Sequence, residues 1–137
     1  MTVFVLDTNV ISDIVAPTPN ATVLARLAAN RTHTLCLCEP VDYEIRRGYL
    51  KRNATTRLKI YESRIRPQFQ WVAITSADWQ KAAQFWAHTV GHGRQLADID
   101  LLVAAVATRL KAIIVSADDD FDALSIGREN WRFMMDQ

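Results

Sequence analysis

Acidic residues stand at the ends of predicted elements in four separate segments of this 137-residue chain: Asp7 in the first, Glu39, Asp42 and Glu44 in the second, Asp98 and Asp100 in the third, and Asp118, Asp119 and Asp120 in the fourth. Asp7 directly follows the apolar run Val3–Leu6, and Asp118 comes shortly after the apolar run Ala112–Val115. Carboxylate oxygens without histidine or cysteine beside them favour hard cations such as Mg²⁺ or Mn²⁺. Such an ion deprotonates water and stabilises charge on a phosphate, so this set of residues indicates metal-assisted phosphate chemistry.

The energetics of these acids favour a bound cation over simple helix capping. One acid at a helix start caps the helix or complements its dipole, which contributes about 0.3–1 kcal/mol. Capping is the alternative interpretation for Asp42, Asp98 or Asp100 taken singly. Two carboxylates about 5 Å apart repel by about 3 kcal/mol at an effective dielectric of about 20. Several acids that converge therefore need protons or a cation to compensate them.

Apolar patterning predicts the elements that must position these acids. Strands are expected at residues 3–6, 34–38, 71–74 and 112–115, with the tail NWRFMM as a last short strand. Helices are expected at residues 9–15, 22–30, 40–52, 54–64, 77–90 and 100–110. Strands that alternate with helices form a parallel sheet with helices on both faces. We therefore expect one α/β domain over residues 1–137, a three-layer α/β/α sandwich around a central, mainly parallel sheet.

Asp7 is expected at the ligand-binding edge of this sheet. Parallel sheets bind ligands outside the carboxyl ends of their strands, and Asp7 ends the first predicted strand. Asp13, one and a half helical turns further on, is expected to face water. On the helix at residues 77–90, Trp79 and Trp86 belong to an apolar stripe and are expected in the core.

Composition excludes several classes of protein. No apolar stretch approaches the roughly 18 residues that span a bilayer, and no basic segment precedes the first apolar run, so we expect no membrane and a cytoplasmic location. Cys36 and Cys38 lack the second pair of a typical zinc site, and we expect two buried, reduced side chains. His88 and His92 have no obvious third ligand and are expected to face solvent.

Positive charge is concentrated in one part of the chain, although the net charge is only +1. Eight of the sixteen basic residues lie between Arg46 and Arg66. Those that directly follow Glu44 are predicted to contact the phosphate backbone of a nucleic acid: Arg46, Arg47, Lys51 and Arg52. The alternative is a solvated helical face that maintains solubility.

Four motifs, taken in order, resemble the PIN-domain ribonucleases, and especially the VapC-type toxins of toxin–antitoxin pairs: VLDTNVIS, EIRRG, DIDLLVAAVA and IIVSADDDF. The resemblance covers nearly the whole chain. It implies that the catalytic, metal-binding acids are Asp7, Glu44, Asp100 and Asp118. Asp98 is an alternative to Asp100, and Asp120 is an alternative to Asp118. The implied supporting groups are Thr8, Asn9 and Ser116.

The resemblance also implies an activity and partners. It implies an α/β/α endoribonuclease that uses Mg²⁺ or Mn²⁺, acts on RNA, binds a cognate antitoxin protein and forms a homodimer. One alternative is a phosphatase of the haloacid-dehalogenase type, but that chemistry needs a second acid where this chain has Asn9. The other is a non-catalytic PIN-like module that binds RNA or protein, in which an acid of the set would be missing.

Overall fold

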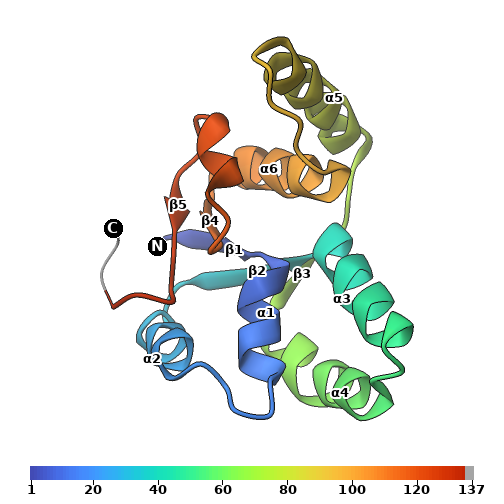
Figure 1. The fold of residues 1–137 in the computed structure, drawn as a ribbon. Helices are drawn as coiled ribbons and strands as arrows, with labels where there is room; N and C mark the ends of the chain where they lie inside the picture. The colour runs from blue at the N-terminus through green and yellow to red at the C-terminus, as the bar shows by residue number, and fades with distance from the viewer. Residues whose placement is uncertain (135–137) are drawn as a thin grey trace.

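Five parallel strands form one sheet in the computed structural model, which describes residues 1–134 (Figure 1). The strands are β1 (Val3–Leu6), β2 (Thr34–Cys38), β3 (Gln70–Val72), β4 (Ile113–Val115) and β5 (Arg128–Glu129). Their order across the sheet is β3-β2-β1-β4-β5, and every neighbouring pair is parallel. The prediction of a parallel central sheet is therefore confirmed.

Helices cover both faces of the sheet. They are α1 (Thr8–Val15), α2 (Ala21–Ala29), α3 (Glu39–Lys51), α4 (Thr55–Ile60), α5 (Ser76–Gly91) and α6 (Asp98–Leu110). In Figure 1, α1, α2 and α4 lie below the sheet, whereas α5 and α6 lie above it. The chain runs outward from β1 to β3 and then returns past β1 to β4. Right-handed crossovers in opposite directions place their helices on opposite faces, which gives the predicted three-layer sandwich.

The return of the chain creates a topological switch point between β1 and β4. Leu6 is opposite Val115 in the sheet, and the backbone N–H of Asp7 donates to the carbonyl of Val115 at 3.0 Å. Loops leave these two neighbouring strands in different directions, which opens a crevice at their carboxyl ends. The first and fourth strands therefore deliver their acids to one place.

The core is continuous because the strands and α6 are apolar on nearly all sides. Residues 4–6 of β1 and residues 101–107 of α6 are buried. Alanines at 104, 105 and 107 let α6 pack closely on the sheet, which fixes the start of α6 at the sheet edge. Cys36 and Cys38 are buried and free, as predicted. No helix within residues 1–134 has the length and apolar character needed to cross a membrane.

The predicted last strand is wrong in position. The strand is Arg128–Glu129, and the chain turns away from the sheet at Asn130, whose side chain accepts the backbone N–H of Arg132 at 3.0 Å. Such a side-chain turn replaces the hydrogen bonds of a strand. Met135, also part of the predicted strand, lies outside the described residues.

The prediction of a buried tryptophan stripe on α5 is also wrong. Trp79 is 60% exposed and Trp86 is 46% exposed. Figure 1 shows α5 at the margin of the molecule, with α6 between it and the sheet. Because only one side of α5 is covered, the apolar stripe is wider than the surface that it buries. The helix after Asn53 also differs, because α4 ends at Ile60 and continues as one wider, π-helical turn, Tyr61–Ile65.

Candidate functional site

An open pocket of about 400 Å³ lies at the carboxyl ends of β1 and β4. It is lined by Asp7, Thr8, Asn9, Ser12, Glu44, Asp100, Asp118 and Arg132. The four predicted acids therefore meet in one place, although they come from the end of β1, from α3, from the first turn of α6 and from the loop after β4. We call this site the acid pocket.

Asp7 is the most deeply placed acid of the pocket and is only 4% exposed. Its Oδ2 accepts hydrogen bonds from Ser116 Oγ at 2.7 Å and from Asn9 Nδ2 at 3.2 Å. Its Oδ1 is the one buried side-chain polar atom within residues 1–134 that has no hydrogen-bond partner. Buried polar atoms are almost always paired, and leaving one unpaired costs about 1–3 kcal/mol. Asp7 Oδ1 is therefore an unpaired hydrogen-bond acceptor that the fold maintains at some cost.

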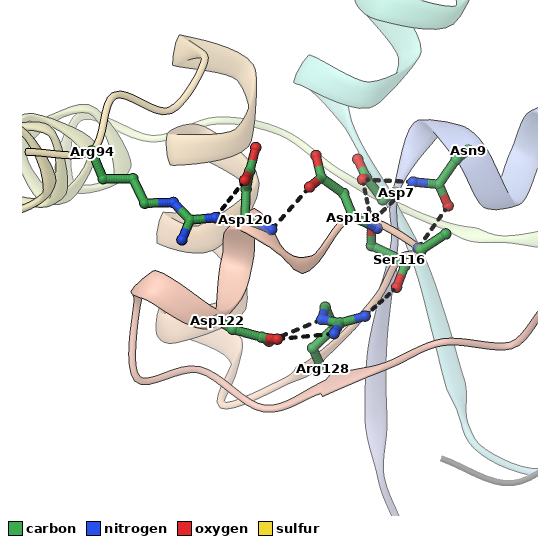
Figure 2. Close-up of polar contacts among 9 residues, drawn as sticks. Asp7, Asn9, Arg94, Ser116, Asp118, Asp120, Asp122 and Arg128 are labelled. Carbon is green, nitrogen blue, oxygen red and sulfur yellow. Dashed lines mark hydrogen bonds and ion pairs between the residues drawn. The ribbon is translucent and has the colours of Figure 1, made fainter. Parts of the chain in front are cut away.

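Asn9 and Ser116 connect the start of α1 to the loop after β4 (Figure 2). Asn9 Nδ2 donates to Ser116 Oγ at 2.9 Å, and Asn9 Oδ1 accepts the backbone N–H of Ala117 at 3.1 Å. Ser116 Oγ also accepts the backbone N–H of Asp118 at 3.0 Å. These bonds fix Asp118 relative to Asp7. Asn9 and Ser116 therefore contact Asp7 directly, and their supporting role in catalysis stays a prediction.

Thr8 orients the second acid. Its Oγ1 donates to Glu44 Oε1, which holds the carboxylate of α3 against the start of α1. Arg47 Nη2 lies 3.5 Å from the other oxygen of Glu44. Thr8 therefore contacts one of the predicted acids, and its supporting role stays a prediction.

Two acids of the pocket, Asp7 and Asp100, have raised pKa values. Burial raises the pKa of Asp100 to about 7, and the charges of Asp7, Asp118 and Glu44 add to this shift. Burial also raises the pKa of Asp7, against the hydrogen bond from Ser116 that lowers it. A pocket of four carboxylates, two of which resist ionisation and one of which has an unpaired oxygen, fits a hard divalent cation, because the cation compensates the charge and takes oxygen ligands.

The alternatives Asp98 and Asp120 do not line the acid pocket. Asp120 Oδ1 accepts from Arg94 Nη2 at 2.5 Å, and Figure 2 shows this pair on the opposite side of the loop from Asp7. Oxygens of residues 118–120 do lie within 4.8 Å of one another. Asp120 already has a cationic partner, however, so we assign only Asp118 of this group to the pocket. Asp98 is exposed and lines a different pocket, beside Trp79.

None of the four predicted RNA-binding residues lines the acid pocket. Arg46 is held by Asp42 at 2.9 Å, and Asp42 also accepts the buried hydroxyl of Tyr61 at 2.5 Å. Arg46 thus takes part in a network that attaches α3 to the π-helical turn Tyr61–Ile65. Lys51 and Arg52 are exposed at the end of α3. Contact of these residues with RNA stays a prediction.

Arg132 is a pocket residue that sequence reasoning missed. It reaches the pocket from the C-terminal tail and bonds Asp13, with its Nε 2.7 Å from Asp13 Oδ2. The prediction that Asp13 faces water is therefore wrong. The two residues are 119 positions apart, and no pattern of spacing indicates that they pair.

A family model for the PIN domain matches residues 4–127. The FitAcB structure from Neisseria gonorrhoeae is 25% identical in sequence, with a TM-score of 0.82 over 93% of this chain and 97% of that chain. DNA-bound VapBC from Salmonella typhimurium is 21% identical, with a TM-score of 0.83 over 96% of this chain and 99% of that chain.

A third solved structure, Mycobacterium tuberculosis VapC20, is described as a toxin that cleaves the sarcin–ricin loop. It is 15% identical to this chain, with a TM-score of 0.69 over 98% of this chain and 99% of that chain. At their lower identities, the VapBC and VapC20 structures demonstrate a shared fold. No curated protein matches the chain in sequence at a significant level.

Proposed function

The chain belongs to the PIN domain family, and from this premise we propose that it is a metal-dependent endoribonuclease that acts as the toxin of a toxin–antitoxin pair. One observation carries the metal-dependent part of the proposal. The buried Asp7 Oδ1 has no partner among the described residues, and Asp7 lines a pocket with three further acids from separate segments. A fold that served only to bind RNA or protein would gain nothing from this arrangement, because uncompensated carboxylates destabilise it.

Mg²⁺ or Mn²⁺ is the proposed cofactor, held by Asp7, Glu44, Asp100 and Asp118. When bound, such an ion lowers the pKa of water and stabilises negative charge on a phosphate. Ser116 and Asn9 hold Asp7 through Oδ2, which leaves Oδ1 without a partner among the described residues. Thr8 holds Glu44 through Oε1 in the same way. Hydroxyl and amide groups of the fold therefore orient two of the four carboxylates.

The phosphatase alternative has no support in the pocket. The position where that chemistry requires a second acid is Asn9, and its amide is engaged with Asp7, Ser116 and Ala117. An amide cannot protonate a leaving group as a carboxylic acid does. RNA as substrate and an antitoxin as partner are proposed from the resemblance of the chain to PIN-domain toxins and from its similarity to toxin–antitoxin complexes.

A homodimer is part of the same proposal. Trp79 and Trp86 of α5 line an apolar pocket with Leu101 and Leu102 of α6. Exposed aromatic residues that gather at such a pocket are typical of an interaction site, and a second copy of the chain would cover them. Light scattering of the purified chain tests this: a dimer that becomes a monomer in Trp86→Ser supports the proposed surface, and a wild-type monomer contradicts it.

RNA cleavage by the purified chain tests the proposed activity. Labelled single-stranded RNA is incubated with wild type, Asp7→Asn and Asp119→Asn, in Mg²⁺, in Mn²⁺ and in EDTA. Asp119 is the matched control, because it is an exposed acid close to the pocket that does not line it. We expect cleavage by wild type and Asp119→Asn in metal only, and a loss of at least about a thousandfold in Asp7→Asn.

Two results would contradict the proposed activity. Equal cleavage by wild type and Asp7→Asn would identify a contaminating nuclease. Absence of cleavage by wild type on both unstructured and structured RNA, with either metal, would favour the non-catalytic alternative. Coexpression with the neighbouring reading frame tests the toxin role, since an antitoxin should restore growth that the toxin alone arrests.

A further inference from the structure

The tail that carries Arg132 is fixed to the body of the protein by contacts that do not involve Arg132. Trp131 is 1% exposed, and its ring centroid lies 5.3 Å from that of Phe4 in β1. Arg26 of α2 donates to the carbonyl of Phe133 at 3.0 Å and to the carboxylate of Glu129 at 3.0 Å. The backbone on both sides of Arg132 is therefore held in place.

Asp13 then fixes the guanidinium of Arg132. Nε lies 2.7 Å from Asp13 Oδ2 and Nη2 lies 3.1 Å from Asp13 Oδ1, which is a two-point contact between planar groups. Asp13 is four residues after Asn9 on α1, so the two side chains are neighbours on one face of the helix. The contact with Asp13 therefore holds Arg132 about one helical turn along α1 from Asn9, and Arg132 is the one basic residue that lines the acid pocket within residues 1–134.

This ion pair is poorly explained as a stabilising contact. Its side chains are 44% and 18% exposed, and exposed pairs contribute only about 0–1 kcal/mol to folding. Trp131 and Arg26 already hold the tail. A guanidinium has five N–H donors, and the two-point contact occupies only one side of it. Nη1 has no hydrogen-bond partner among the described residues, so it remains available to a ligand.

We propose that Arg132 binds a backbone phosphate of the substrate beside the acid pocket, and that Asp13 is its positioning residue. The proposal rests on the proposed nuclease function. A substrate phosphate that approaches the pocket meets four carboxylates, and their charge repels it wherever the metal does not compensate them. A guanidinium fixed in its plane binds phosphate through two parallel hydrogen bonds and loses little side-chain entropy on doing so. Arg132 thus contributes substrate binding from the C-terminal tail, a segment that carries none of the four pocket acids.

Steady-state kinetics on a short single-stranded RNA separate binding from chemistry. We expect Arg132→Gln to raise KM about tenfold, with kcat changed by less than about twofold, because the lost contact binds substrate and transition state equally. Arg132→Lys should recover part of the loss. Asp13→Asn should raise KM about threefold, since it keeps the cation but no longer fixes its plane. Arg94→Gln is the matched control and should behave as wild type, because Arg94 pairs with Asp120 outside the pocket.

Salt-dependent RNA binding tests the inference without requiring cleavage. Fluorescence anisotropy of labelled single-stranded RNA is measured in EDTA, which also keeps the RNA intact. The slope of log binding constant against log salt concentration should fall by about 0.7 in Arg132→Gln, the value for one phosphate contact on a single strand. Arg94→Gln should keep the wild-type slope. Thermal melting checks that each variant is folded, and Arg132→Lys serves if Arg132→Gln is not.

The outcomes distinguish this inference from the proposed function. Unchanged KM and unchanged salt slope in Arg132→Gln would overturn the role of Arg132 while leaving nuclease activity intact. A wild-type chain that binds RNA without cleaving it would overturn the nuclease proposal, and the salt slopes would still decide whether Arg132 binds phosphate. A wild-type chain that neither binds nor cleaves RNA would overturn both.

Discussion

Two buried aspartates show opposite electrostatics. Asp78, at the start of α5, is 1% exposed and accepts two hydrogen bonds at 2.9 Å from Arg109 of α6. Burial alone would raise the pKa of Asp78, but Arg109 and Thr75 outweigh it and hold the pKa below its usual value. Asp7 is nearly as buried, receives only hydroxyl and amide donors from side chains, and has a raised pKa.

Asp78 is an acid that stabilises the fold, whereas the burial of Asp7 costs the fold stability. Asp78 completes a capping box with Thr75 and an ion pair between two helices, so its ionised form favours the native state. Asp7 has no cationic partner among the described residues, and Arg132, the one basic residue in the lining of its pocket, is paired with Asp13. A missing partner is thus a sharper indication of a functional site than burial or acidity.

Replacement of Asp100 should give the largest effect, and on activity alone. Asp100→Asn should lower kcat/KM for RNA by at least about a thousandfold, equivalent to about 4 kcal/mol, because it removes a proposed metal ligand. The metal-free melting temperature should stay the same or rise, since the change removes a repelling charge. Cleavage assays and melting in EDTA measure the two effects. A marked drop in melting temperature would contradict the contrast with Asp78, because it would mean that Asp100 also stabilises the fold.

Replacement of Asp78 should have the opposite pattern. Asp78→Asn should lower the free energy of unfolding by about 2 kcal/mol, less than for a fully buried ion pair because Arg109 is 34% exposed. The loss comes from an unpaired guanidinium and a weakened helix cap. Urea unfolding gives the change in stability, and cleavage well below the melting temperature should remain at the wild-type rate. If Asp78→Asn is as stable as wild type, Asp78 does not have the stabilising role that we assign to it.

The pH dependence of metal-free stability should report the acid pocket. The folded-state pKa of Asp100 is raised to about 7 from an ordinary value of 3.8, so the stability it contributes is present at low pH and is lost as pH rises through about 7. The pH dependence of Asp78 has the opposite sign, because its pKa is lowered in the folded state. The stability that it contributes is present above its ordinary pKa and is lost as the pH falls through its lowered pKa.

Stability in EDTA should therefore fall by about 1 kcal/mol between about pH 5 and pH 8, after allowance for solvent screening. Urea unfolding at a series of pH values measures this slope. Millimolar Mg²⁺ should flatten it, because the ion replaces the proton as the compensating charge. Asp100→Asn serves as the control and should also flatten it. A slope that persists in both would assign the titration to another group.

The smallest effect is expected at Asp120. Asp120 pairs with Arg94 at the surface, with both side chains 47% exposed, so Asp120→Asn should change stability by less than about 0.5 kcal/mol. Cleavage should remain within about twofold of wild type because Asp120 does not line the pocket. Parallel assays of Asp98→Asn should agree. A large loss of cleavage in Asp120→Asn would extend the metal site along the loop after β4.

Much of the site follows from local sequence and from the rules of parallel sheets. Apolar runs that end in acids predict which strands carry the ligands, and alternation of strands with helices predicts that those ends meet at one edge. The acids Asp7, Glu44, Asp100 and Asp118 meet there as expected. These features depend on the spacing of apolar residues and on the direction of the chain, and both can be read from the sequence.

Only the tertiary structure separates Asp118 from Asp120, exposes Trp79 and Trp86, and brings Arg132 to Asp13. Each of these depends on which surfaces meet when distant segments pack. Asp118 and Asp120 are two residues apart and chemically identical, and the position of Arg94 decides which of them is already paired. The order of the residues is enough to predict the sheet and the acids at the carboxyl ends of its strands. Which charges are compensated follows from packing alone, because compensation depends on distances between side chains from distant segments.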